Sequence, residues 1–311
     1  MRHCPITYVE ITNQEYYSQQ GLRLLSPQLI KLDALNLSAD EQRSEAINRV
    51  GKMSVQGVQK KLSAQLKIKE GRFEIVDQYG QFILKPQSDL YPELPENEAI
   101  TMTLAKIVGL NVPVHGLVYS KDKSMTYFIK RFDRAGHSKK LAIEDFAQLS
   151  GEDRQTKYNS SMEKVIHVVS RFCTFPKIEY VKLFKLTLFN FLVGNEDMHL
   201  KNFSLITQDN KVYLSPVYDL LNTTIAMQNV AEELALPLNG KKSNLTKKDF
   251  LHYFGKERLQ LNQNIMLQVI NDIQLALPVW REFIRNSFLS LDMQEKYLHL
   301  LSERQKRLGI E

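Results

Sequence analysis

The feature that most constrains the fold of this chain is a long apolar stretch that leads directly into a polar loop. Between residues 178 and 193, apolar side chains lie nearly all round a helix of that length. These positions are Val181, Leu183, Phe184, Leu186, Leu188, Phe189, Phe191 and Leu192. Such a helix is stable only when other elements cover all its sides, so it predicts a buried central helix in a large helical body. The chain then enters Gly194-Asn195-Glu196-Asp197 without a break.

The chain before residue 134 has a pattern typical of strands. Alternate positions from Leu62 to Ile68 are apolar, which predicts a half-buried strand. Further strands are expected at residues 73–75, 81–85, 117–119 and 127–129. Between them, Pro95 and the acidic residues after it favour a helix start, and Gly109 is placed to end that helix.

After Asp133 the pattern becomes helical. Helices are expected at residues 162–172, at 178–193 and from Asp249 onward, with short strands at 203–206 and 212–214. The apolar positions of the last part predict a core that contains Trp280, Phe283, Ile284 and Phe288.

These patterns predict an α+β protein with two lobes. We expect an N-terminal extension of short helices over residues 1–50, a small β-rich lobe over 51–134 and a larger helical lobe over 135–311. The short helices are suggested by Leu24, Leu25, Leu29, Ile30, Leu32 and Leu35. A ligand is expected in the cleft between two such lobes.

Composition excludes several other classes of protein. The two cysteines, Cys4 and Cys173, form no CxxC pair, which argues against a disulfide framework or a zinc site. No apolar run is long enough to cross a bilayer, and the N-terminus lacks the apolar region of a signal peptide, so we expect a cytoplasmic protein with no membrane contact. Export by a non-classical route stays open.

The net charge of +6 comes from scattered lysines and arginines without interleaved aromatic residues, so solvated surface is favoured over a nucleic-acid groove.

The polar loop after the apolar helix has the spacing of a kinase catalytic loop. Asp197 is followed five positions later by Asn202, as in the pattern D-x-x-x-x-N. Phosphoryl transfer needs a carboxylate that orients the attacking hydroxyl and an oxygen ligand for the metal on the phosphates. A polar turn without function would give the same letters, so the spacing is weak by itself.

The residues that follow strengthen this interpretation. After a predicted hairpin the chain reaches Asp219, in the order in which kinases place their metal-binding carboxylate. Mg²⁺ prefers carboxylate and amide oxygens together with water, so Asp219 and Asn202 are the expected ligands. The alternative for Asp219 is a residue that caps the next segment.

Two upstream features match the other parts of a kinase. Lys85 ends a predicted strand, as does the kinase lysine that contacts the α- and β-phosphates, and Glu98 on the next helix is its expected ion-pair partner. The loop that contains Gly57 enters a strand and offers backbone N–H groups to phosphates. Each feature has an alternative interpretation. Lys85 could be an exposed lysine at a strand edge, Glu98 could be present only because acidic residues favour helix N-termini, and the loop could be an ordinary one.

Taken in order, these stretches resemble the HipA family of serine/threonine kinase toxins. The resemblance covers roughly residues 54–221, and its most specific motif is GNEDMHLKNFS followed by Tyr218-Asp219. The other matching stretches are SVQGVQKKLSA, FILKP, ENEAITMTLAKIVGLNVP, FIKRFDR, IEDFAQLSG and LSPVYDLL. Because only 53 residues precede Ser54, the chain looks more like HipT, the compact toxin of the three-gene HipBST systems, than like full-length HipA relatives.

The resemblance implies a role for individual residues. Asp197 is expected to be the catalytic base, Asn202 and Asp219 the Mg²⁺ ligands, and Lys85 a phosphate contact. The nucleotide loop would consist of Gln56, Gly57, Val58, Gln59, Lys60 and Lys61. The remaining ATP-binding positions would be the hinge residues Lys130, Arg131 and Phe132, together with His199, Leu200, Lys201 and Tyr218. For His199, a role in anchoring the loop is an equal alternative.

The family also suggests a self-silencing switch. Ser54 matches the serine that such kinases autophosphorylate, and two negative charges there would repel a triphosphate. Some small relatives carry a second serine where this chain has Gln56, which puts two-site control in doubt. A loop serine without regulation is the alternative.

The resemblance therefore implies an ATP- and Mg²⁺-dependent protein kinase and toxin. Its substrate would be a protein, expected to be an aminoacyl-tRNA synthetase, and antitoxins encoded nearby would be its partners. Nucleic acid would be contacted only through a DNA-binding antitoxin. Two alternatives stay open. The chain could be a small-molecule kinase with the same core, or a non-catalytic pseudokinase that binds a partner.

Overall fold

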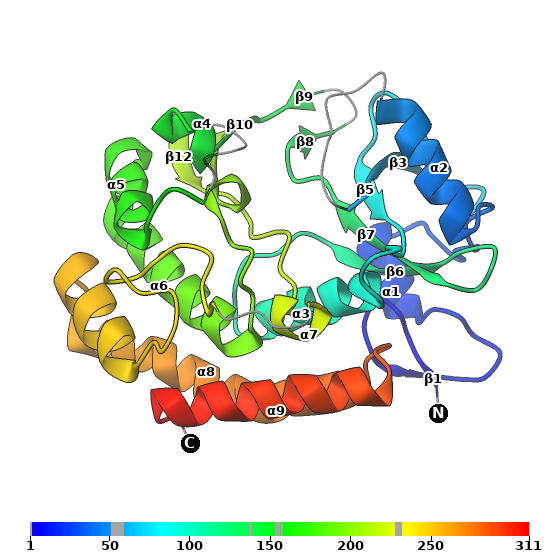
Figure 1. The fold of residues 1–311 in the computed structure, drawn as a ribbon. Helices are drawn as coiled ribbons and strands as arrows, with labels where there is room; N and C mark the ends of the chain where they lie inside the picture. Colours follow the sequence, from blue (N-terminus) through cyan, green and yellow to red (C-terminus); the bar gives the residue numbers. More distant parts are fainter. Residues whose placement is uncertain are drawn as a thin grey trace. The chain divides into compact units, whose positions relative to one another are not determined.

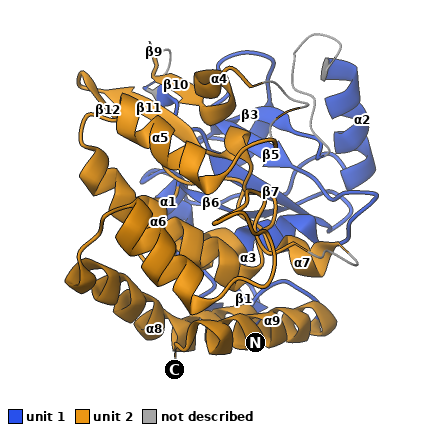
Figure 2. Ribbon diagram, turned by 60° about the vertical axis from the view of Figure 1, so that its left-hand side comes forward, with its two compact units in different colours: residues 1–100, 113–139, 285–290 blue, residues 101–112, 140–284, 291–311 orange. Residues whose placement is uncertain are grey.

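The computed structural model describes residues 2–50, 59–136, 139–152, 156, 158–227 and 232–310. The expected loop residues Ser54, Gln56, Gly57 and Val58 lie outside these ranges. The chain divides into two compact units, shown in Figure 2. Unit 1 comprises residues 1–100, 113–139 and 285–290, and unit 2 comprises residues 101–112, 140–284 and 291–311.

Unit 1 is built on an antiparallel sheet of five strands. In spatial order these are β4 (Arg72–Ile75), β3 (Leu62–Lys67), β5 (Phe82–Lys85), β7 (Met125–Lys130) and β6 (His115–Tyr119). Every predicted strand before residue 134 is therefore present. The register pairs Leu84 with Phe128 and Lys85 with Tyr127, so Leu84 and Lys85 point to opposite faces of the sheet.

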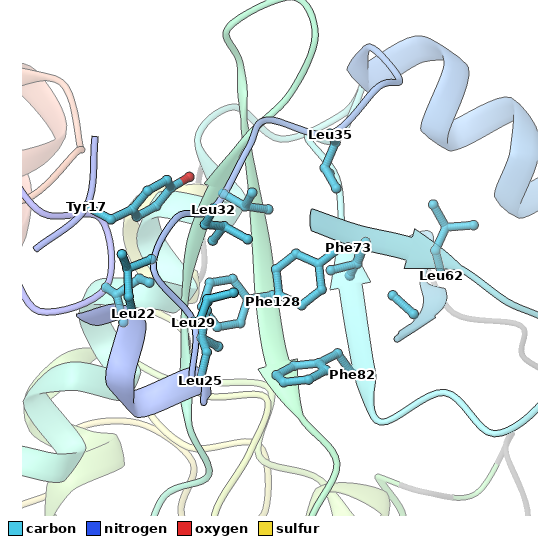
Figure 3. Close-up of a cluster of buried hydrophobic side chains, with 14 of the residues drawn as sticks. Tyr17, Leu22, Leu25, Leu29, Leu32, Leu35, Leu62, Phe73, Phe82 and Phe128 are labelled. Atoms are coloured by element: carbon cyan, nitrogen blue, oxygen red, sulfur yellow. The ribbon is translucent and has the colours of Figure 1, made fainter. Parts of the chain in front are cut away.

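One face of this sheet carries the core of unit 1. Figure 3 shows the rings of Phe73, Phe82 and Phe128 next to one another, and their centroids lie 5.1–6.2 Å apart. Aromatic pairs at such spacings stabilise the core beyond the area that they bury. Leu25, Leu29 and Leu32 of the N-terminal segment pack against this face.

The N-terminal segment differs in part from the short helices expected there. It contains α1 (Gln19–Leu25) and α2 (Ala39–Val50), together with the short paired strands β1 (Arg2–His3) and β2 (Glu10–Ile11). The leucine-rich stretch 29–35 is not helical. Leu29, Leu32 and Leu35 are buried against the sheet. They belong to a non-helical segment that covers one face of the sheet.

Helix α3 (Leu94–Ile107) contributes its first residues to unit 1 and the rest to unit 2. The other helices of unit 2 are α4 (Phe146–Ser150), α5 (Met162–Phe172), α6 (Pro176–Val193), the 3₁₀ turn η1 (Leu200–Asn202), α7 (Thr223–Ala226), the π-helix η2 (Asp249–Arg258), α8 (Gln263–Arg285) and α9 (Leu291–Leu308). Figure 1 shows α9 along the side of α6, which it contacts. Almost all of α6 after Glu179 is buried, as its sequence predicted.

Unit 2 also holds a small antiparallel sheet. Its strands are β10 (Ala142–Asp145), β11 (Ser204–Gln208) and β12 (Lys211–Leu214), in that order. The hairpin between β11 and β12 was predicted and β10 was not. Outside this sheet, the short strand β8 (Arg134–Ala135), which belongs to unit 1, pairs with β9 (Lys139–Lys140).

The predicted C-terminal core is correct in part. Trp280 and Ile284 are fully buried, whereas Phe283 and Phe288 are only half-buried. Among the described helices, none is both long and apolar enough to cross a membrane. The two cysteines are buried and free.

Candidate active site

The catalytic loop begins where α6 ends. Gly194 caps this helix in a left-handed conformation with φ of 68°, and its N–H bonds the carbonyls of Asn190 and Phe191. A side chain here would clash with Leu300 and lie 2.6 Å from Thr224 Oγ1. Only glycine meets both demands, because it adopts a positive φ without strain and has no Cβ.

The first residues of the loop are tied to the segment that follows Asp219. Glu196 N–H donates to Thr223 Oγ1 at 2.7 Å, and Thr223 Oγ1 donates to the carbonyl of Gly194 at 3.0 Å. Thr224 Oγ1 donates to Glu196 Oε1 at 2.9 Å. Both threonines belong to α7, so this short helix fastens the loop that carries Asp197.

The carboxylate of Asp197 is engaged by an aromatic hydroxyl. Tyr158 Oη donates a short hydrogen bond to Asp197 Oδ1, and His199 Nε2 lies 3.8 Å from the same oxygen. The rings of Tyr158 and His199 meet edge to face at 5.1 Å. Burial and the negative charge of Asp197 raise the pKa of Tyr158, so its proton stays on the phenol.

Asn202 is oriented by the backbone of the same loop. Its Nδ2 donates to the carbonyl of Asp197 at 2.8 Å, and its own N–H bonds the carbonyl of His199 at 2.9 Å. With its nitrogen fixed in this way, the amide offers its oxygen to a ligand. An amide oxygen suits Mg²⁺, so the residue fits the metal-binding role predicted for it.

The second predicted metal ligand follows the hairpin. Asp219 is half-buried and has φ of 55°, a left-handed conformation that is uncommon outside glycine. Its neighbour Tyr218 is fixed through its hydroxyl, which lies 2.5 Å from Ser204 Oγ and 3.1 Å from the carbonyl of Lys201. Burial raises the pKa of Tyr218. The carboxylate therefore sits on a strained main chain anchored by the preceding side chain.

These two residues supply only part of a metal site. Among the described residues, no group of three or more His, Cys, Asp and Glu could hold a metal ion. Mg²⁺ is commonly bound by one or two carboxylates together with substrate phosphates and water. When bound, Mg²⁺ would neutralise charge on the transferred phosphoryl group. Asn202 and Asp219 would hold it.

Unit 1 contains the other predicted pair. Lys85 Nζ lies 2.6 Å from Glu98 Oε1, and both side chains are almost completely buried, 3% and 2% exposed. Lys85 also lies 5.5 Å from the ring centroid of Tyr127, its partner across the sheet. The pair forms because the pleat directs Lys85 away from the phenylalanine core and towards α3. Thus the sequence prediction that these two residues meet is correct.

The remaining predicted positions are spread over both units. Arg131 forms a bidentate ion pair with Asp133, at 2.9 and 2.7 Å, and the N–H of Lys130 bonds the carbonyl of Val114. Phe132 is half-buried, as are Gln59, Lys60 and Lys61. In the catalytic loop, Leu200 is fully buried and Lys201 half-buried. Nucleotide contacts of all these residues stay predictions.

Sequence reasoning missed three residues next to the base. Tyr158 lies in no motif, and Glu196 lies inside the catalytic motif with no pattern to mark its side chain. Arg304 Nη2 on α9 lies 3.9 Å from Glu196 Oε1, although the two are far apart in the chain. No local spacing connects Tyr158 or Arg304 to Asp197, and nothing in the motif shows that the side chain of Glu196 is buried.

Comparisons with known proteins agree with this arrangement. A family model for the HipA-like C-terminal domain matches residues 53–280. A Haemophilus influenzae protein named "Putative kinase" is 31% identical over 282 residues, which cover 81% of this chain and 80% of that protein. The serine/threonine-protein kinase toxin HipA of Shewanella oneidensis is 28% identical over 248 residues, 73% of this chain and 56% of that toxin. This chain thus matches little more than half the length of that toxin.

Solved structures share the fold. HipA of Shewanella oneidensis, in a complex with HipB and operator DNA, matches with a TM-score of 0.67 and 22% identity, covering 91% of this chain and 74% of that one. The Helicobacter pylori proinflammatory kinase CtkA matches with a TM-score of 0.54 and 18% identity, covering 74% of this chain and 88% of that one. The family match, the relatives and the fold lead to one conclusion: the chain belongs to the HipA family of kinases.

Proposed function

We propose that the chain is an ATP- and Mg²⁺-dependent serine/threonine protein kinase and the toxin of a toxin–antitoxin system. The observation that carries the proposal is the catalytic loop, in which Asp197 is fixed at the end of a buried helix and Asn202 is oriented by the carbonyl of Asp197. Asp197 would accept the proton of the attacking hydroxyl, and Asn202 and Asp219 would hold the metal.

The buried pair in unit 1 supports the same activity. Lys85 and Glu98 form the ion pair that kinases need, in which the glutamate holds the lysine for the phosphates of ATP. A buried ion pair costs desolvation energy and is weak as a device for stability, so a functional reason for keeping it is favoured here.

The toxin role and its partners rest on the relatives. One of them is named a kinase toxin, and the solved HipA structure contains HipB and operator DNA. We infer that this chain also binds an antitoxin and reaches DNA only through it. Its substrate is proposed to be a protein, with an aminoacyl-tRNA synthetase as the first candidate, and its site of action the cytoplasm. The same proposal includes autophosphorylation at Ser54.

The test is phosphosite mapping by mass spectrometry on three forms of the full chain expressed in cells. Wild type should carry phosphate on Ser54 and should transfer label from ATP to protein. Asp197→Gln should lose both, because removing a base costs on the order of 10²-fold or more in rate. Ser54→Ala should lose only its own phosphorylation.

The two other functions give different results. Transfer of label to a metabolite and to no protein would establish a small-molecule kinase instead. If Asp197→Gln arrests growth as strongly as wild type, the chain acts by binding a partner and not by phosphorylation.

A further inference from the structure

Behind the catalytic loop lies a group of buried charged side chains that the proposed reaction does not use. Glu196, Glu233 and Arg304 are 8%, 7% and 5% exposed. Burying a charge is costly unless an opposite charge or hydrogen bonds compensate it. A cluster of three such residues, one of them directly before Asp197 in the chain, therefore calls for an explanation.

Arg304 is the centre of this cluster. Its Nη1 lies 3.1 Å from Glu233 Oε1, and its Nη2 lies 3.9 Å from Glu196 Oε1. The guanidinium also lies 4.7 Å from the ring centroid of Phe191, close to the end of α6. Arg307, one turn further along α9, forms a second ion pair with Glu233. Arg307 also pairs with Glu303 on the surface of α9, at 2.7 Å, so Arg304 is the arginine that connects Glu233 to Glu196.

Glu233 has a structural role independent of the catalytic loop. Its Oε2 accepts the N–H of Leu245 at 2.8 Å, and its own N–H bonds the carbonyl of Lys242 at 2.6 Å. It therefore joins α9 to the segment between α7 and η2. Glu196 differs from Glu233 because it lies in the catalytic loop, directly before Asp197.

The side chain of Glu196 is held on one side only. Thr224 and Arg304 both approach Oε1, whereas Oε2 is buried and has no hydrogen-bond partner among the described residues. Burial raises the pKa of Glu196 to about 7, while Thr224 and Arg304 oppose this rise. Arg304 is therefore the cation that favours the ionised form of this carboxylate and attracts it to α9.

This anchoring reaches Asp197 through the main chain. Consecutive Cα atoms are fixed about 3.8 Å apart, so a residue whose side chain is held behind the loop restricts the position of the next residue. Asn195, two residues before Asp197, is also held: its Nδ2 donates to Asn190, and its Oδ1 accepts the N–H of Asp197 at 3.3 Å. The main chain that leads into Asp197 is thereby constrained at both preceding residues.

We propose that Arg304 is a positioning residue for phosphoryl transfer, acting through Glu196 to hold the main chain that carries Asp197. The inference rests on the kinase function proposed above and deepens it, because it assigns a catalytic contribution to the C-terminal helix α9. A displacement of the base on the order of 1 Å can lower a rate by about 10²-fold, so modest loosening of the loop is sufficient.

A purely structural role makes a different prediction. If Arg304 only stabilises the fold, its replacement lowers the melting temperature and leaves kcat per folded molecule unchanged. A positioning role lowers kcat while the KM for ATP stays constant, since Arg304 acts on the base. The two roles are separated by measuring kcat, KM and thermal unfolding on the same samples.

The experiment compares four variants of the full chain, assayed by label transfer from ATP-Mg²⁺ to a generic serine-containing protein. We expect Arg304→Met to lower kcat by about 10-fold or more, with KM for ATP within about twofold of wild type. Arg304→Lys keeps the charge and should recover most of the loss. Glu196→Gln keeps the bond from Thr224 and should lower kcat by about 3- to 10-fold.

The matched control is Arg281→Met. Arg281 on α8 also contacts α9, donating to Ser302 at 3.0 Å and to Gln305 at 2.6 Å, and neither partner touches the catalytic loop in the described contacts. Its replacement should lower the melting temperature without changing kcat. That result would show that loosening α9 elsewhere leaves the base in place.

Each outcome decides the question. A folded Arg304→Met variant with kcat within twofold of wild type overturns the inference and leaves the kinase function standing. If Arg304→Met does not fold, Glu196→Gln decides, and an unchanged kcat there also overturns it. A wild type that transfers phosphate neither to an added protein nor to its own Ser54 overturns the proposed function, and the inference with it.

Discussion

The hydroxyl of Tyr158 donates a hydrogen bond to the carboxylate of Asp197, the contact that a serine hydroxyl makes with the base of a kinase. Tyr158 comes from the segment before α5, and 39% of it is exposed to solvent. If Asp197 is the base, as proposed above, this phenol competes with a substrate hydroxyl for Oδ1.

Replacing Tyr158 with Phe should therefore help the acceptor to bind. A hydrogen bond to a charged group contributes about 1.5–3 kcal/mol, and only part of this is lost when a new hydroxyl takes its place. We expect the KM for a protein acceptor to fall by about 3- to 10-fold and the KM for ATP to stay unchanged. Steady-state kinetics with both substrates varied measure this, and a lower kcat with constant KM would instead assign Tyr158 to orienting the base.

The pair Lys85–Glu98 should show separate effects on stability and on activity. Glu98→Leu leaves a buried lysine without its carboxylate, which should lower the free energy of unfolding by about 3–5 kcal/mol. The double variant Lys85→Met with Glu98→Leu should recover most of that stability, because no charge is left unpaired. Neither variant should transfer phosphate at more than a small fraction of the wild-type rate.

Chemical denaturation and label transfer on the same samples test this pair. Full activity in the double variant would exclude Lys85 from nucleotide contact. A double variant no more stable than Glu98→Leu would show that packing, and not charge, causes the loss.

Gly194 offers a test with an internal control. Gly194 and Gly151 both cap a helix in the left-handed conformation, with φ of 68° and 71°. A Cβ at Gly151 meets no atom within 4 Å, whereas one at Gly194 clashes with Leu300 and crowds Thr224. Gly151→Ala should therefore cost only the backbone strain of about 1–2 kcal/mol.

Gly194→Ala should cost clearly more, by about 1–3 kcal/mol beyond the control, because overpacking adds to the strain. It should also lower kcat, since the neighbours that must move hold the catalytic loop. Melting temperatures and kinetics of the two variants are compared directly. Equal losses of stability would show that the packing around Gly194 adjusts without cost.

Glu96 should make the stability of unit 1 depend on pH. Burial raises the pKa of Glu96 to about 7, although Gln87 donates to both of its oxygens at 2.7 and 2.8 Å. Because the pKa is higher in the folded state, the stabilising contribution is complete below pH 4.5 and is lost as pH rises to about 7. The loss amounts to about 3 kcal/mol at most.

The variant Glu96→Gln has no group to ionise at this position. The free energy of unfolding of wild type should therefore fall relative to that of the variant between pH 4.5 and pH 8. Denaturant titrations at four or five pH values measure the difference. Parallel curves for the two proteins would show that the pKa of Glu96 is the same in the folded and unfolded states.

Much of the site was predictable from sequence, because its parts depend on local patterns. The strand from Phe82 to Lys85 has a period of two, which places Lys85 on the face opposite Leu84. Helix α3 follows soon after and carries Glu98, so only one local connection brings the two charges together. The spacing of Asp197 and Asn202 fits a single turn of chain, in which Asn202 bonds the carbonyl of Asp197.

The leucines at 29–35 show where such patterns fail. Their spacing suggested a helix, but Leu29, Leu32 and Leu35 cover the phenylalanine face of the sheet as an extended segment. The conformation of this segment depends on the surface that its leucines bury, and that surface is formed by residues far along the chain. Local propensity is a weak prior when burial of this kind opposes it.

The sequence alone thus determined most of the strands and helices that carry the candidate site and the short spacings of its motifs, since periodicity and local spacing encode both. Only the tertiary structure decided what surrounds the base. Tyr158 reaches Asp197, and Arg304 reaches Glu196, through the packing of elements that no spacing in the sequence connects. Contacts of this kind depend on which surfaces meet when the core forms, and a pattern of residue types along one segment carries no information about them.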